Sequence, residues 1–517
     1  MDVLATVTVS FLAVLVSFLR MAAALIVSVL FSIVVGTAAG VNKSFEKVAV
    51  PVLDILQSIP ILGFFPVAIQ VFYAASPMFG AELAAIFLIF TSQVWNITFA
   101  VYESTRFIQP ELLDVANSMR MSAFERFRHI YLPACLPRIV RNFQPSWANG
   151  MFFIVGAEIL SFGDVELKLF GVGTLVSEFA VAGDLLGIVT VLLILVAATI
   201  MVNVLLFIPL GTMFETAGPP SPGLLRRFAF IKKLAKPFQT TLATPVISFF
   251  EYQRSVSGLV NKVSVLGSLV RNLIFLILIG FLATLAITRG NEFFGSLYQT
   301  LGRVGVDNLL SSAVFSFVRV MGAVGFSVAW SIPAAVAIAR RPQLSTAVTT
   351  VFQVVASIPV TIVYPLFAET LKDQPELRAF VMILAATQWY VFFQVLAGLK
   401  NIPRSELEVA DMLQLKTWTR IRMVYLPRAL PALITGCITA AGGAWNGLVV
   451  AERLVLGDLV AETNLPGLGK LLSQLTYAGD LLGSVSVLIV MSSIVVLMNR
   501  FFWKKLYDMV ASKLKIE

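Results

Sequence analysis

Four ionisable residues stand out because each borders or enters an otherwise apolar stretch. Arg20 and Arg319 each precede about 20 mostly apolar residues, and Glu158 and Glu452 each close such a stretch. With a rise of about 1.5 Å per helical residue, all four side chains are expected at one depth, roughly 30 Å from the opposite helix ends. Ionisable residues in membrane helices usually face one another or the bundle interior. We therefore expect Arg–Glu pairing at the external mouth, either as an outer gate or as part of the entry path.

The same four positions admit a second interpretation. Long Arg side chains near a helix end also snorkel to the lipid headgroups while their stems stay in the apolar layer. Carboxylates at the level of Glu158 and Glu452 would repel an anion unless the Arg residues neutralise them. These residues therefore leave pairing and snorkelling both open, and they do not by themselves identify a substrate.

Residues suited to catalysis or metal binding are scarce. The single His, His129, and the two Cys, Cys135 and Cys437, form no cluster with the spacing of a zinc or haem site. The segment 467–470, Gly-Leu-Gly-Lys, lacks the spacing and the Ser or Thr of a phosphate-binding loop. We expect no cofactor, no metal and no catalytic residue, so the chain itself is not expected to be an enzyme.

The composition indicates a membrane protein. Of 517 residues, 58% are hydrophobic and 13% are charged, whereas a soluble globular protein has about 25% charged residues. Several apolar stretches approach or exceed the roughly 20 residues that cross a bilayer as a helix. The net charge of +9 does not indicate nucleic acid as a partner, because that needs a basic soluble face. The sequence predicts an all-α polytopic membrane protein in contact with lipid.

The basic residues mark one side of the membrane. They gather in short loops and in a linker at about 214–268, and the positive-inside rule makes these segments and the C-terminus cytoplasmic. Residues 3–17 either extend the first helix or lie in the interface. The pattern gives about 11 transmembrane helices. They are expected at about 18–40, 50–74, 82–103, 137–160, 185–213, 269–288, 309–338, 346–370, 377–398, 431–452 and 481–502.

The chain is an internal duplication with an interval of about 294–299 residues. Pro133 and Glu158 are 25 residues apart, and so are Pro427 and Glu452. Both copies place the same polar segment on the cytoplasmic side, so the halves are parallel repeats related by an axis along the membrane normal. The recurring segments are 17–20, 114–116, 131–133 and 183–187, which return as 316–319, 408–410, 425–427 and 479–483.

The duplicated polar segment carries a recognisable motif. It opens with an acidic residue, Asp114 or Glu408, and six residues later comes Arg120 or Gln414. Nine residues, 121–129 or 415–423, then precede an apolar-x-Leu-Pro motif. This pattern resembles the EAA loop of binding-protein-dependent ABC importer permeases. Four further motifs look like the nitrate/sulfonate/taurine branch of that family: Trp-Asn-Gly at 445–447, Ala-Glu at 451–452, Gly-Leu-Gly at 467–469 and Gly-Asp at 479–480.

The resemblance implies that the two EAA-like segments couple the chain to an ATPase. Arg120 and Gln414 stand where the family has Gly, which puts the turn between the two short helices in question, because Gly readily adopts positive φ. Ser122 with Glu125 is expected to cap the second short helix, and Thr417 its counterpart. The implied coupling positions are Asp114, Ala116, Arg120, Ile130, Leu132, Pro133, Glu408, Ala410, Gln414, Val424, Leu426 and Pro427.

The resemblance also implies an architecture. It is a tandem parallel repeat of two MetI-like type I ABC permease domains, at 1–213 and 269–517, joined by the basic cytoplasmic linker at 214–268. Such a chain would lie in the plasma membrane and supply both halves of a translocation path. Its implied partners are two ABC ATPase subunits, which would hydrolyse ATP in its place, and an extracytoplasmic solute-binding protein.

The substrate and the energy source remain expectations. The resemblance suggests a small solute such as nitrate, a sulfonate, taurine or a related organic molecule. The alternative is a secondary transporter driven by an ion gradient, a class that also uses duplicated bundles. It would need ionisable groups near the bilayer midplane, of which the sequence has few, and it would leave the duplicated cytoplasmic segment unexplained.

Overall fold

The computed structural model describes residues 3–64, 78–162, 165–207, 298–340, 360–456 and 459–514, with single residues and short pieces between some of these ranges. The predicted linker at 214–268 and the predicted span at 269–288 lie outside the described residues.

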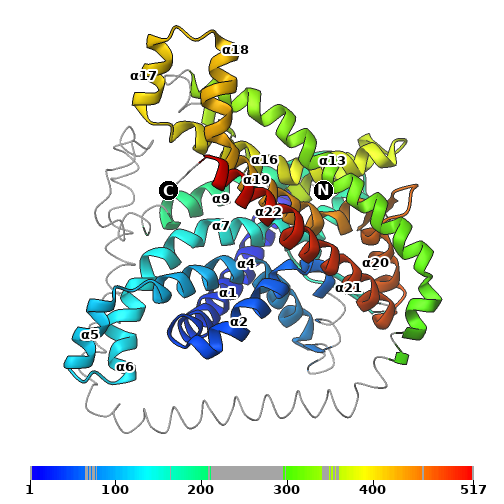
Figure 1. Cartoon of the computed structure of the whole chain (residues 1–517). Helices are drawn as coiled ribbons and strands as arrows, with labels where there is room; N and C mark the ends of the chain where they lie inside the picture. Colours follow the sequence, from blue (N-terminus) through cyan, green and yellow to red (C-terminus); the bar gives the residue numbers. More distant parts are fainter. Residues whose placement is uncertain are drawn as a thin grey trace.

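Each copy is built from the same series of elements (Figure 1). The first consists of α1 (Val3–Val41), α2 (Lys43–Ser58), η1 (Ile61–Phe64), α4 (Gly80–Arg106), α5 (Pro110–Ser118), α6 (Ala123–Arg126), η2 (Phe127–Tyr131), α7 (Leu132–Glu158), β1 (Ile159–Phe162), β2 (Val165–Lys168), α8 (Val172–Val181), α9 (Leu185–Val202) and η3 (Asn203–Phe207). The second consists of α13 (Val306–Ala339), α15 (Val360–Thr370), α16 (Pro375–Lys400), α17 (Arg404–Met412), α18 (Thr417–Arg420), η6 (Ile421–Tyr425), α19 (Leu426–Glu452), β3 (Arg453–Leu456), β4 (Leu459–Glu462), α20 (Leu468–Tyr477), α21 (Leu481–Leu497), η7 (Met498–Trp503) and α22 (Lys504–Leu514).

Long apolar helices dominate the described residues, which confirms the predicted all-α polytopic class. α7 is as long as α19 but is not among the helices apolar enough to span by composition, because polar residues between Arg138 and Asn149 lower its hydropathy. Seven stretches qualify: Leu4–Val41, Gly80–Arg106, Leu185–Phe207, Val306–Ala339, Pro375–Lys400, Thr417–Glu452 and Leu481–Val510.

Two predicted spans differ from the observed helices. α1 begins at Val3, so residues 3–17 extend the first helix. The predicted span at 50–74 is not one helix, because α2 ends at Ser58 and Ile59 is extended, with φ −73° and ψ 126°. Pro60 follows, and a residue before proline is disfavoured in the helical region. α15, Val360–Thr370, falls in the last part of the predicted 346–370 span, and most residues of that span before Val360 lie outside the described residues.

The loops after α7 and α19 have a structure of their own. In each copy a short antiparallel hairpin follows the long helix, with Ile159 opposite Lys168 in one and Arg453 opposite Glu462 in the other. A short helix comes next, α8 or α20. The sequence predicted external loops here, and the structure adds two hairpins and two short helices to the all-α bundle.

The two copies share one hydrophobic core. Within the copies, α1 packs on α4 and α4 on α7, as α13 packs on α16 and α16 on α19. Between the copies, α15 lies against α7 and α8, and α20 lies against β1. The side-chain oxygen of Asn446 in α19 accepts a hydrogen bond of 2.8 Å from the backbone N–H of Ile61. The halves therefore form a single body, with α5–α6 and α17–α18 projecting from the same side (Figure 1).

Candidate functional site

The duplicated polar segment folds as two short helices joined by a tight turn. α5 ends at Ser118 and α6 begins at Ala123, and α17 and α18 repeat the arrangement. The N–H of Arg120 donates to the carbonyl of Asn117, and the N–H of Met121 donates to that of Ala116, both at 3.0 Å. This bonding closes the end of a helix with one residue in the left-handed region. Equivalent bonds from residues 414 and 415 close α17.

The residues that replace the family Gly hold that left-handed position. Arg120 has φ 50° and Gln414 has φ 48°, and they are the described non-glycine residues with positive φ. The turn is thus kept in both copies without a glycine. An L-residue in this region costs about 1–2 kcal/mol relative to the right-handed helix, so each copy stores modest backbone strain at its turn.

The two predicted helix caps have different outcomes. The Ser122 hydroxyl accepts from the N–H of Glu125 at 3.3 Å, and the Glu125 carboxylate accepts from the N–H of Ser122 at 2.6 Å, which confirms the capping box. The hydrogen bond from the Ser122 N–H has the larger effect on the pKa of the Glu125 carboxyl and the interaction with the Ser122 hydroxyl the smaller, and both lower it. The predicted cap by Thr417 is wrong, because Lys416 occupies the cap position and no side chain caps α18.

The apolar-x-Leu-Pro motif forms the junction with the long helix. η2 and η6 are π-helical turns, in which the N–H of Leu132 bonds to the carbonyl of Phe127 and that of Leu426 to Ile421. Pro133 and Pro427 follow at once, and a proline ring clashes with an α-helical turn and cannot donate its hydrogen bond. The wider turn accommodates the proline and keeps each short helix continuous with α7 or α19.

Each helix pair presents apolar side chains outward. Ala116 and Ala410 are buried beneath the pairs. Asp114 and Glu408 are exposed beside them. Large apolar side chains on the same surfaces are exposed: Leu112, Val115, Met119 and Phe124 in the first copy, and Val409, Met412, Leu413, Trp418 and Met423 in the second. Exposed apolar residues gathered in this way indicate a docking surface for another protein.

The two surfaces differ in their internal ion pairs. Arg420 pairs with Asp411, and Arg428 pairs with Glu406. One repeat earlier, Asn117 replaces the acidic Asp411 and Ala134 replaces Arg428, so neither pair is available to the first copy. The second helix pair is therefore held to its own junction by charges that the first pair lacks.

At the opposite end of the bundle, Arg20 lies in a buried ion cluster. The side chain is 5% exposed, and its Nη1 is 2.8 Å from the Oε1 of Glu158, which is fully buried. Its Nε and Nη2 donate to both carboxylate oxygens of Glu82, at 2.6 and 2.7 Å. The guanidinium also donates to the carbonyl of Phe170 at 2.8 Å. Arg20 is thus buried and paired, not snorkelling.

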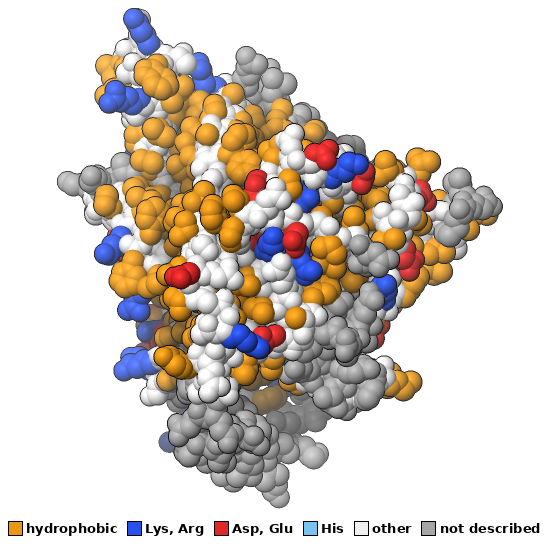
Figure 2. Space-filling view, turned by 90° about the vertical axis from the view of Figure 1, so that its right-hand side faces the viewer, with side chains coloured by type: hydrophobic (Ala, Val, Ile, Leu, Met, Phe, Trp, Pro, Cys, Tyr) orange, Lys and Arg blue, Asp and Glu red, His pale blue; other side chains and the backbone are white. Residues whose placement is uncertain are grey.

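The second copy repeats the cluster around Arg319. Its Nη1 is 2.7 Å from Glu452 and donates to the carbonyl of Pro466 at 2.9 Å. Its Nη2 is 2.7 Å from Glu376. Each pair lies within one copy, so neither bridges the two halves. Figure 2 shows Lys, Arg, Asp and Glu side chains gathered in the middle of the face that it presents.

Glycine lets the short helices close over the buried carboxylates. A Cβ at Gly171 would lie 2.3 Å from Glu158, and one at Gly467 would lie 2.1 Å from Glu452. The Glu158 carboxylate accepts from the N–H of Gly173 at 2.7 Å, as the Glu452 carboxylate does from Lys470 at 3.0 Å. Helix N-terminal N–H groups favour negative charge, so the starts of α8 and α20 help to hold these carboxylates.

Sequence reasoning missed the second acidic partner of each Arg. Glu82 and Glu376 lie at the start of α4 and α16, outside the stretches that drew attention to the other four residues. The available signal was the repeat itself, since Glu82 and Glu376 are separated by the same 294 residues as Glu158 and Glu452. A search of the duplication for paired acidic positions would have found them.

Two buried Trp rings and both Cys side chains have packing roles. The Trp147 ring lies edge-on to Phe18 at 5.3 Å between centroids, and Trp445 is buried in the shared core. Cys135 and Cys437 are buried free thiols, and His129 is exposed at the junction of the first helix pair.

The fold and its duplicated helix pairs define a class of transport protein. The model of the family described as "Binding-protein-dependent transport system inner membrane component" matches residues 28–211 and again 327–505. The chain therefore belongs to this family, with two copies of its domain.

Individual relatives show how far the similarity extends. The chain is 30% identical over 154 residues to the bicarbonate transport system permease protein CmpB of Synechococcus elongatus, covering 30% of this chain and 53% of the relative. It is 27% identical over 149 residues to the nitrate import permease protein NrtB of the same species, covering 29% and 51%. The chain thus spans about half the length of these relatives. The chain is 21% identical over 490 residues to the trimethylamine N-oxide transport system permease protein TmoV of Ruegeria pomeroyi, covering 88% of this chain and 70% of the relative.

Proposed function

We propose that the chain forms the translocation pathway of an ATP-driven importer and docks separate ABC ATPase subunits through α5–α6 and α17–α18. The observation that carries this proposal is the duplicated helix pair. Two surfaces with the same left-handed turn and exposed apolar side chains lie at one end of a single body. Each is continuous with a long helix, so a movement imposed on the short helices reaches the core of the bundle.

The proposed partners follow from the number of surfaces. Two helix pairs accommodate two ATPase subunits, and an extracytoplasmic solute-binding protein would deliver the solute at the opposite face. The positive-inside rule supports a cytoplasmic position for both helix pairs, the linker and the C-terminus. The protein would then be a multi-pass protein of the plasma membrane, with ATP hydrolysis confined to its partners.

The proposed substrate is a small solute. Relatives are named for bicarbonate, nitrate and trimethylamine N-oxide, and another is named for aliphatic sulfonates. Nitrate, a sulfonate, taurine or a related organic molecule all fall within this range.

We further propose that the two Arg–Glu clusters fix the external mouth. Arg20 of α1 donates to the carbonyl of Phe170, between β2 and α8, and Arg319 of α13 donates to the carbonyl of Pro466, between β4 and α20. Each cluster thus ties the first long helix of its copy to the segment between the hairpin and the short helix. Pairing within each copy favours a clamp that keeps each half rigid while the halves move relative to one another.

The test of the importer proposal is co-purification of the full chain from native membranes, followed by an ATPase assay. An ATPase subunit should accompany the wild type and be lost from the double variant Asp114→Arg/Glu408→Arg, because both reversals fall on the exposed helix pairs. The matched control is Glu178→Arg/Asp307→Arg, two exposed acidic positions away from these surfaces. If no hydrolytic subunit accompanies the wild type in mild detergent, the proposal is wrong and ion-driven transport takes its place.

A further inference from the structure

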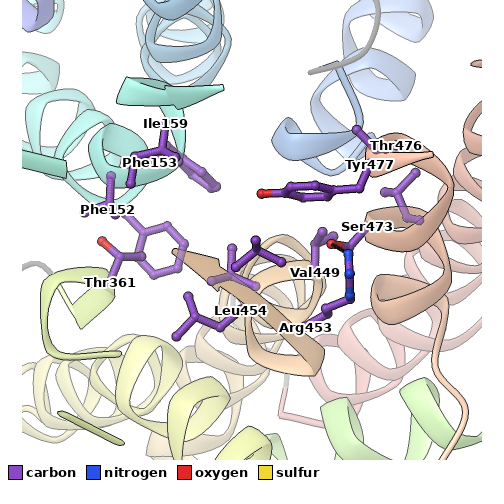
Figure 3. Close-up of a pocket in the computed structure, with 15 residues that line it drawn as sticks. Phe152, Phe153, Ile159, Thr361, Val449, Arg453, Leu454, Ser473, Thr476 and Tyr477 are labelled. Carbon is purple, nitrogen blue, oxygen red and sulfur yellow. Dashed lines mark hydrogen bonds between the residues drawn. The ribbon is translucent and has the colours of Figure 1, made fainter. Parts of the chain in front are cut away.

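A cavity lies between the two copies, near their Arg–Glu clusters. Its volume is ≈ 100 Å³. A water molecule takes about 30 Å³ of the liquid, so the space suits roughly three waters or an ion of a few heavy atoms. Figure 3 shows that α7 and β1 of the first copy form one wall, while α19, β3 and α20 of the second copy form the others. Any group bound here contacts both halves at once.

The walls are mainly apolar. Phe152, Phe153 and Ile159 line the cavity from the first copy, and Val449 and Leu454 line it from the second. Such walls favour the hydrocarbon part of a ligand, because burying apolar surface stabilises the complex by about 25 cal/mol per Å². A fully hydrated inorganic ion gains nothing from them.

One charged side chain, Arg453, is among the described residues that line the cavity. Its Nε is 3.3 Å from Glu462, and its Nη1 donates to the Ser473 hydroxyl at 3.3 Å. The guanidinium carbon lies 5.1 Å from the centre of the Tyr477 ring. Both polar contacts are longer than the 2.7–2.9 Å typical of charge-assisted hydrogen bonds.

The carboxylate beside Arg453 is shared with a second cation. Glu462 also lies 3.3 Å from the Nζ of Lys470. These three residues carry one more cation than carboxylate, and the adjoining cluster of Arg319, Glu376 and Glu452 carries one more carboxylate than cation.

The first copy shows whether the hairpin needs a cation at the position of Arg453. Ile159 occupies the position equivalent to Arg453, and the first copy forms the same hairpin with its cation, Lys168, on the opposite strand, where the second copy has Glu462. Thr174 likewise stands one repeat before Lys470. Since the hairpin forms without a cation at the position of Arg453, the presence of Arg453 in the second copy needs another explanation.

Polar groups around the cavity supply further donors. The Thr361 hydroxyl lines it, the residue is 6% exposed, and among the described residues that hydroxyl has no hydrogen-bond partner. A buried hydroxyl without a partner is costly, by about 1–3 kcal/mol. The hydroxyls of Ser473, Thr476 and Tyr477 also border the space. A ligand with an acceptor oxygen would satisfy the Thr361 hydroxyl, whereas the Ser473 hydroxyl already accepts from Arg453 and the Thr476 hydroxyl pairs with that of Ser484.

We propose that this cavity is a binding site for a small organic anion, a carboxylate or sulfonate with a short apolar body, whose charged group contacts Arg453. The site rests on the proposed transport function, because it would hold the solute between the halves on its way across. The apolar walls take the hydrocarbon part, and Arg453 with the Thr361 hydroxyl takes the oxyanion.

The test is isothermal titration calorimetry on the purified full chain with defined probes. Ethanesulfonate and propanoate should bind, whereas the neutral isostere propanamide should bind at least roughly tenfold more weakly, since one charged hydrogen bond accounts for such a ratio. Nitrate and bicarbonate, which lack an apolar body, should also bind at least roughly tenfold more weakly than propanoate. Equal affinity for propanamide and propanoate would overturn the anion assignment, and equal affinity for nitrate would overturn the organic one.

Two variants locate the site. Arg453→Gln should weaken ethanesulfonate binding at least roughly tenfold, while Arg303→Gln, which removes an exposed cation paired with Asp480, should leave it unchanged. Thr361→Val should also weaken binding without disturbing the fold, because its hydroxyl has no described partner. Wild-type affinity in both Arg453→Gln and Thr361→Val would place the anion elsewhere.

The result is independent of the ATPase test. Probe binding that depends on Arg453, with no ATPase subunit in the co-purification, would keep the site and remove the importer function. Co-purification without any probe binding would keep the importer function and remove the site.

Discussion

At the residue scale, the turn of each docking helix pair departs from what its sequence favours. Arg120 and Gln414 adopt positive φ, where glycine is the residue of lowest cost. Both side chains are exposed, so the chain accepts backbone strain and gains a large polar side chain on the surface. This exchange is reasonable at a binding surface, where strain tends to be kept.

Relief of that strain is measurable. Gln414→Gly should raise the free energy of unfolding by about 0.5–1 kcal/mol, because the left-handed penalty of about 1–2 kcal/mol exceeds the entropy cost of glycine. Glu408→Gly, in the helical part of α17, should lower it by up to about 1 kcal/mol. Unfolding of the purified chain in detergent gives both values, and a loss of stability in Gln414→Gly would contradict the strained-turn interpretation.

The buried ion clusters make a second prediction at this scale. Arg20→Gln leaves the buried carboxylate of Glu158 without its cation, so the free energy of unfolding should fall by about 3 kcal/mol or more. Adding Glu158→Gln should recover part of that loss. The control is Arg138→Gln, whose pair with Glu103 is exposed and should matter by less than about 1 kcal/mol. Strict additivity of the Arg20 and Glu158 changes would show that the two side chains do not interact.

At the element scale, the short helices α8 and α20 depend on a close approach that only glycine permits. The carboxylates of Glu158 and Glu452 lie where a Cβ of Gly171 or Gly467 would be. Each short helix thereby covers a buried carboxylate and donates an N–H to it. The hairpin, the short helix and the Arg cluster form one unit at the end of each copy.

Removing that space should separate the short helix from the cluster. Gly467→Ala should lower the free energy of unfolding by about 1–3 kcal/mol, the usual cost of overpacking. Gly442→Ala is the matched control, because it lies in α19 with open space around its Cβ and should stabilise the helix by up to about 1 kcal/mol. Thermal unfolding of both variants decides the point, and equal midpoints would remove the packing argument.

At the scale of the whole molecule, one chain carries two similar but unequal docking surfaces. Trp418 is 73% exposed, whereas Phe124, one repeat earlier, is 37% exposed. The ion pairs of Arg420 and Arg428 add rigidity to the second surface alone. Exposed Trp on a rigid surface is a frequent anchor in protein interfaces.

The inequality predicts unequal binding of the proposed ATPase partners. Trp418→Ala should weaken association by about 2 kcal/mol, roughly thirtyfold, and Phe124→Ala by clearly less. Titration of the partner subunit against each purified variant gives the two affinities. Equal losses would show that the surfaces dock equivalently despite their different exposure.

Sequence periodicity and repetition predicted much of the architecture. Hydropathy predicted the membrane class, and the repeat interval aligned Glu158 with Glu452 and Asp114 with Glu408. The helix end at Ser58 was missed, because a break before Pro60 leaves a weak signal in average hydropathy, while the extension of the first helix through residues 3–17 was one of two stated alternatives. The Ser122 cap was predictable because its hydrogen bonds join residues close in sequence. Of the two acidic partners of Arg20, Glu158 on α7 was predicted and Glu82 on α4 was not.

The sequence by itself determined the membrane class, the duplication and the positions of the helix pairs, because these follow from composition, local periodicity and spacing along the chain. Only the tertiary structure decided which carboxylates surround Arg20 and Arg319, and that Arg453 and Thr361 border one cavity. Those contacts join residues far apart in the chain, and their geometry depends on how α1, α7, α15 and α19 pack together. Packing of this kind has no signature in any single stretch of sequence.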